Sequence, residues 1–80
     1  MRTNFDEAVR LKEQTRCLIG EKINFAEHTA VISNIEVREE EKEKYEVWYH
    51  VHSTQRGDFA LSFDGIVAAN PKIMAFADPV

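Results

Sequence analysis

The stretch from Lys44 to Ser53, KYEVWYHVHS, constrains the fold more than any other part of the chain. It is rich in β-branched and aromatic residues, which suit a pleated and half-buried surface. Its side chains also alternate with a period of two, as they do in a strand with one buried face. The predicted core face holds Tyr45, Val47, Tyr49 and Val51, and the predicted outer face holds Glu46, Trp48, His50 and His52. The stretch therefore predicts a strand whose outer face carries an indole and two imidazoles.

Two further segments are expected to pair with this strand in an antiparallel meander. Residues 29–38 and 58–63 show the same alternation, and polar turns join them to the central strand. Gly57 stands at the third position of the second turn, where a residue at positive φ is required. The charged run over residues 39–43 is expected to be the solvated tip of the first hairpin, with the turn centred on Glu41.

The register of the meander follows from keeping its apolar residues on one face. This condition pairs Ile35 with Val47 across the first hairpin. The same register places Ile32 opposite His50 on the outer face and Ser62 beside His50 from the other side. Small residues next to a large indole would allow another element to approach closely, so this outer face is the expected contact surface.

A helix is expected before the meander. Asn4 has the character of an N-cap, and Glu7 stands three residues later, as in a capping box. Gly20 suits the position just past a helix end. We therefore predict a helix over Phe5–Ile19 that packs on the core face of the sheet.

The end of the chain allows two interpretations. Asn70 followed by Pro71 is a good helix start, which predicts one or two helical turns within residues 71–77. A final edge strand over Ile73–Phe76 fits the same residues. The pattern does not decide between these alternatives.

Composition limits the fold class and the compartment. A chain of 80 residues is expected to form a single domain spanning residues 1–80. Net charge is −4, which disfavours binding to nucleic acid or to an anionic membrane. Cys17 is the only cysteine, as suits a reducing compartment. The N-terminal residues carry no signal-like apolar run, and no segment approaches the roughly 20 apolar residues that span a bilayer, so we expect a cytoplasmic location.

These patterns together predict an α+β fold. An N-terminal helix packs on an antiparallel β-meander of three to four strands. The alternative is a small SH3-like barrel with an added N-terminal helix, because short and sharply twisted strands can close on themselves.

The three histidines raise a different possibility. His50 and His52 are two residues apart on one strand, so their imidazoles point the same way, and His28 is expected on the same face. Such a set could bind zinc or supply an acid–base group. No motif completes a catalytic site, however, and no carboxylate is expected close to these imidazoles. A small His-dependent metal-binding protein or enzyme that uses His28, His50 and His52 is therefore the alternative function.

The leading expectation is a non-enzymatic protein–protein interaction module, either an adaptor or a small inhibitor of a larger protein. It is expected to form a homodimer and to bind another protein through its outer sheet face. No cofactor, metal, nucleic acid or membrane is expected to take part. The expected contact residues are Trp48, His50, His52, Ile32 and Ser62, together with Glu40 and Glu41 from the acidic tip.

Overall fold

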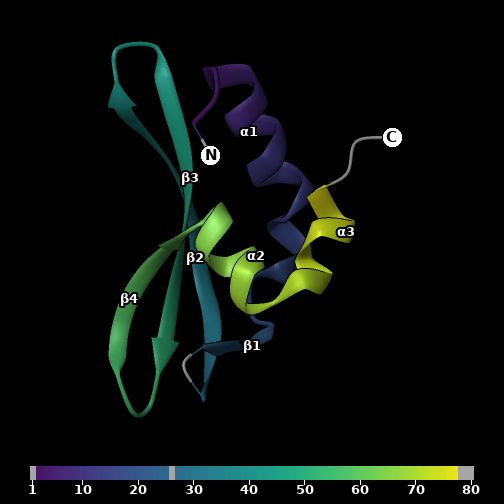
Figure 1. The fold of residues 1–80 in the computed structure, drawn as a ribbon, viewed down its shortest axis with the longest axis vertical. Helices are drawn as coiled ribbons and strands as arrows, with labels where there is room; N and C mark the ends of the chain where they lie inside the picture. The colour runs from purple at the N-terminus through teal and green to yellow at the C-terminus, as the bar shows by residue number, and fades with distance from the viewer. Residues whose placement is uncertain (1, 26, 78–80) are drawn as a thin grey trace.

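The computed structural model describes residues 2–25 and 27–77 (Figure 1). The helical segments stand at the two ends of the chain, with four consecutive strands between them. In chain order the elements are α1 (Phe5–Gln14), the 3-10 turn η1 (Arg16–Leu18), β1 (Lys22–Phe25), β2 (His28–Glu41), β3 (Lys44–Ser53), β4 (Gly57–Ser62), α2 (Phe63–Ala69), the 3-10 turn η2 (Pro71–Ile73) and α3 (Met74–Ala77).

The strands form one antiparallel sheet in the order β1-β2-β3-β4, and the helices lie together against one of its faces (Figure 1). This arrangement confirms an α+β fold built on a meander. The sheet curls without closing, since β1 and β4 remain its two edges. At one end the curl brings Phe25 of β1 and Phe59 of β4 together, with ring centroids 5.2 Å apart. The described strands therefore form an open half-barrel, and not the closed barrel that was the alternative expectation.

The hydrophobic core lies between the helices and the inner face of the sheet. From β3 it receives Tyr49, Val47 and Val51, as the alternation predicted, and each is almost completely buried. α1 contributes Ala8 and Leu11 to the same core. The remaining core residues are Leu18, Ile23, Ala30, Ile32, Ile35, Phe63, Ile66 and Ile73.

α1 begins where the sequence predicts and ends earlier. The Asn4 side chain accepts a hydrogen bond of 2.8 Å from the backbone N–H of Glu7, which confirms the N-cap. The expected continuation to Ile19 is wrong, because the helix closes at Thr15 and the chain then forms η1. Gly20 has a φ of +93°, so it occupies the left-handed region that a glycine after a helical segment adopts readily.

From Asn34 to Glu39 the pairing of β2 with β3 differs by two residues from the one predicted, and at Val31 and Ile32 it differs by one. Val37, and not Ile35, pairs with Val47, and β2 continues to Glu41 before a turn at Lys42 and Glu43. Between Ile32 and Asn34 the pairing is interrupted by a bulge that leaves one extra residue in β2. Because of this extra residue, the positions that face the core before the bulge and those that face it after the bulge are out of step by one residue.

The C-terminal part of the chain is helical. Residues 63–69 form α2, and Phe63, which was expected to end the strand over residues 58–63, is the first residue of this helix. The Ser62 hydroxyl caps this helix by accepting a hydrogen bond of 3.3 Å from the N–H of Gly65. Of the two alternatives for residues 71–77, the structure shows helical turns, with Pro71 at the first position of η2.

Candidate functional site

The outer face of the sheet is the face turned away from the helices (Figure 1). By the burial pattern of β3, Trp48, His50 and His52 belong to this face. Alternation along β3 places them there, because Val47, Tyr49 and Val51 turn into the core. Neighbouring strands add Glu36 and Arg38 from β2 and Asp58 and Ala60 from β4. We call the set of Glu36, Arg38, Glu40, Trp48, His50, His52, Asp58 and Ala60 the outer-face cluster.

Charged groups hold the indole of Trp48 from two sides. Its Nε1–H donates a hydrogen bond of 2.6 Å to Oε1 of Glu40. The guanidinium of Arg38 lies 5.3 Å from the ring centroid, within the range of a cation–π contact. Trp48 is half-buried, so part of its apolar surface remains open to solvent. The contacts with Glu40 and Arg38 restrain its position.

Glu36 links the neighbouring imidazole to Arg38. Nε2 of His50 lies 2.7 Å from Oε1 of Glu36, and Nε of Arg38 lies 3.1 Å from the same oxygen. The hydrogen bond from His50, and after it the one from Arg38, lowers the pKa of the Glu36 carboxyl below its usual value. Glu36 is therefore held in its charged form, which suits a carboxylate that accepts two charge-assisted bonds.

His52 has a carboxylate of its own. Nδ1 of His52 lies 2.6 Å from Oδ1 of Asp58 on β4. Beside His50 and Asp58 the face is hollowed by a depression of about 450 Å³, which is also lined by Asn34 and Ala60. A side chain of another molecule could enter this hollow, since Ala60 fills little of it.

Not all of the predicted contact residues lie on this face. The placement of Ile32 is wrong: it is fully buried on the core side, because the bulge after it reverses the faces of β2. Ser62 pairs with Trp48 instead of His50, and its hydroxyl is occupied in capping α2. Glu40 joins the cluster through Trp48, whereas Glu41 forms ion pairs with Arg2 and, at 3.7 Å, with Lys44.

The third histidine does not share the outer face. His28 pairs with Phe25 at the start of β2, and alternation puts it on the same side as the buried residues Ala30 and Ile32. Within residues 2–25 and 27–77, no three His, Cys, Asp or Glu side chains come together in a way that could hold a metal ion. The predicted sharing of one face by three histidines is therefore wrong.

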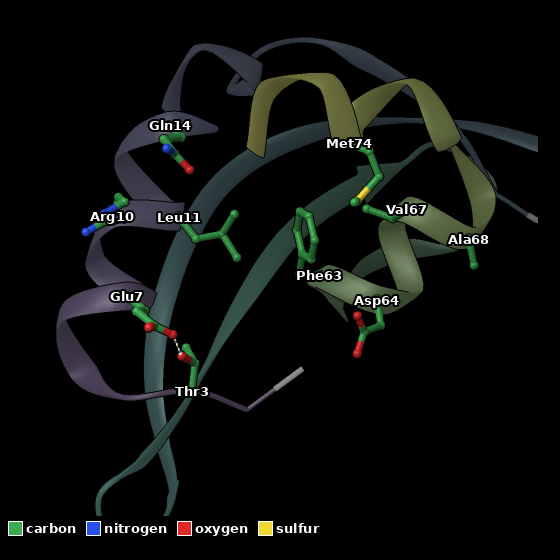
Figure 2. A pocket seen from close by; sticks show the side chains of 10 residues that line it. All are labelled: Thr3, Glu7, Arg10, Leu11, Gln14, Phe63, Asp64, Val67, Ala68 and Met74. Atoms are coloured by element: carbon green, nitrogen blue, oxygen red, sulfur yellow. Dashed lines mark hydrogen bonds between the residues drawn. The ribbon is translucent and has the colours of Figure 1, made fainter. Parts of the chain in front are cut away.

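A second concave site, which the sequence did not predict, lies on the helical side of the molecule. Figure 2 shows Leu11 and Phe63 facing each other across it, with Met74 and Val67 beside them. Its volume is about 600 Å³, within the range of about 300–1,000 Å³ that is usual for ligand pockets. Polar residues form its rim, among them Glu7, whose carboxylate accepts a hydrogen bond from Thr3. We call this site the helical groove.

The helical groove depends on α2, and a signal for that helix was present in the sequence. Ser62 is a residue type that caps helices, and Asp64 places an acidic side chain in the first turn, so the pair indicates a helix start. The strand predicted over residues 58–63 instead included Ser62 as a strand residue. Recognising Ser62 as an N-cap would have placed Phe63 and Val67 on one side of a helix.

No protein-family model, curated protein or solved structure matches this chain. None of the helices in the described part of the chain has both the length and the apolar character needed to cross a membrane.

Proposed function

We propose that the protein is a non-enzymatic protein–protein interaction module that binds another protein through its outer-face cluster. The observation that carries the proposal is the half-buried indole of Trp48, held by Glu40 and Arg38 on a sheet face that the helices leave uncovered (Figure 1). Interface hot spots are enriched in Trp and Arg, and they gain from side chains that are already fixed before binding.

The charge around the cluster indicates the chemistry of the partner. Between residues 36 and 46 the chain has six Glu against three Lys or Arg, so the hairpin that adjoins Trp48 is acidic. A partner surface with basic side chains around an apolar contact would complement it. The hollow beside His50, with Asp58 in its lining, would accept one such basic side chain.

The test begins with site-specific crosslinking in cells that make the protein. A photo-crosslinking amino acid at Ala60 lies in the hollow of the outer face, and the same group at Ala68 lies at the helical groove as a matched control. We expect position 60, and not position 68, to capture a basic protein. Capture from position 68 alone would contradict the proposal.

Purified components then measure the contribution of the indole. Trp48→Ala should weaken binding of the captured protein by about tenfold or more, as truncation of an aromatic hot spot does. Met74→Ala is the control, because Met74 is exposed at the helical groove and not in the outer-face cluster. Added salt should also weaken binding, since acidic and basic surfaces attract each other less when they are screened. Equal affinity of Trp48→Ala and the wild type would overturn the proposal.

We further propose that the protein acts in the cytoplasm. Cys17 is exposed and is the only cysteine, so the fold uses no disulfide between its own residues and leaves a thiol in contact with solvent. An exposed thiol of this kind persists in a reducing compartment. Trapping of thiols in intact cells should find Cys17 reduced in the cytoplasmic fraction; recovery of the protein in an oxidising compartment would contradict this location.

A further inference from the structure

One edge of β2 is left without a strand beside it. β1 pairs with β2 only over His28–Val31, and Gly20 and Glu21 extend the pairing to Ile32 through backbone hydrogen bonds. From Asn34 to Glu39 no strand of the described chain pairs with this side of β2. The unpaired stretch lies between two bulges, and over its length the ladder with β3 is regular.

The backbone groups that face this open edge can be identified from Tyr45. The N–H and C=O of Tyr45 form hydrogen bonds of 2.7 and 2.8 Å with Thr3, so they point away from β2. In an antiparallel ladder, the residue opposite such a position also points its backbone groups away. That residue is Glu39, and alternation gives Val37 and Ile35 the same direction. All three therefore offer a donor and an acceptor to the open edge.

The side chains of this stretch favour one alignment with a second copy of the chain. Two antiparallel copies related by a two-fold axis at Val37 would place Glu36 of each copy opposite Arg38 of the other. A shift of the axis to Arg38 would instead oppose two arginines, and a shift to Glu36 would oppose two glutamates. Like charges directly opposite each other destabilise a strand pair, so only the first of these alignments has complementary charges throughout its centre.

We propose that two copies of this chain associate through the open edges of β2, antiparallel and centred on Val37, to form one continuous eight-stranded sheet. About six backbone hydrogen bonds would join the copies, from Ile35, Val37 and Glu39 of each. Two ion pairs between Glu36 and Arg38 would flank the centre on the outer face. The two outer-face clusters would lie on the same side of the joined sheet. Self-association of this kind does not depend on which protein the outer-face cluster binds.

The first test uses proline, which removes one backbone donor. Val37→Pro should leave the fold of the monomer intact, because the N–H of Val37 points away from β3 and is not needed within the chain. The variant should raise the dimer dissociation constant by about tenfold or more, measured by sedimentation equilibrium over a concentration series. Ala60→Pro is the matched control. Ala60 pairs with His50, whose backbone groups point toward β2, so the N–H of Ala60 points away from β3 to the outer edge of β4. Loss of this N–H should leave the dimer unchanged.

The second test uses charge and does not depend on whether Val37→Pro folds. Glu36→Arg would oppose two arginines across the axis and should weaken the dimer by about tenfold or more. Adding Arg38→Glu to the same chain exchanges the two charges and should restore most of the affinity. A wild-type protein that is monomeric at every concentration, or a dimer that neither Val37→Pro nor Glu36→Arg weakens, would overturn the proposal. Neither result would alter the crosslinking expected at Ala60.

Discussion

The hydroxyl of Tyr49 donates a hydrogen bond to the hydroxyl of Thr15, with 2.8 Å between the two oxygens. Thr15 uses its own hydroxyl proton on the carbonyl oxygen of Leu11, also at 2.8 Å, which leaves Tyr49 as the donor. Both side chains are fully buried. This bond joins the end of α1 to the centre of the sheet, at the point where the helix stops.

Replacing Tyr49 by Phe should lower the free energy of unfolding by about 1–2 kcal/mol, because a buried hydrogen bond is lost and no volume is gained. Thr15→Val removes the other half of the bond at similar volume. If the two hydroxyls act as one unit, the double variant should cost less than the sum of the two single variants in urea unfolding. Strict additivity would show that the bond contributes nothing of its own.

Tyr49 also makes the free energy of unfolding depend on pH in the alkaline range. Burial raises the pKa of its phenol from 10.0 to about 12. A pKa that is higher in the folded state gives stability that is complete below pH 10 and is lost as pH rises towards 12. Unfolding free energy should therefore fall between these values. Tyr49→Phe, which retains Tyr45, should show a smaller fall over the same range.

Glu36 gives the opposite dependence in acid. The pKa of Glu36 is lowered by the hydrogen bond from His50 and then by the one from Arg38. The charged carboxylate therefore stabilises the fold at pH values above its ordinary pKa of 4.5. That contribution is lost as pH falls below 4.5 through the lower folded value. Glu36→Gln should flatten the decline of stability in this range, and His50→Gln should remove much of the same effect. An acid transition that is identical in the wild type and in Glu36→Gln would contradict this expectation.

Phe63 should be the most sensitive residue of the helical groove. It is 4% exposed, and its ring lies 6.2 Å from that of Tyr49, so its removal opens a cavity in the core. Phe63→Ala should cost about 3–5 kcal/mol of unfolding free energy. Met74 lines the same groove with half of its surface exposed, and Met74→Ala should cost less than about 1 kcal/mol. Thermal or urea unfolding of the two variants provides the comparison.

Local signals predicted a large part of this fold. The alternation from Lys44 to Ser53 identified the central strand and the inward direction of Val47 and Tyr49, because burial on one face leaves a period of two in the sequence. Asn4 indicated the start of α1, and Gly57, with a φ of +77°, marked the second turn of the meander. Each of these features depends on neighbours within a few residues.

The register could not be predicted in the same way. Pairing Val47 with Ile35 or with Val37 keeps apolar residues together, since a slip of two residues preserves both faces. Nor does a bulge have a sequence signature of its own, and Ser33 resembles any other polar strand residue. The placements of Ile32 and His28 were wrong because they lie beyond that bulge. The carboxylates that pair with His50 and His52 could be identified only once the register was known.

The bulge at Ser33 has a consequence for how this protein can vary. Ile32 and Ile35 are three positions apart, yet both turn inward, which an uninterrupted strand would not allow. Deleting Ser33 would turn Ile32 toward solvent and Val31 toward the core. To keep an apolar core, the first half of the strand would also have to exchange its apolar and polar positions. A homologue that lacks this insertion should therefore carry the reversed alternation over residues 28–32 and the same alternation as here from Asn34 onward.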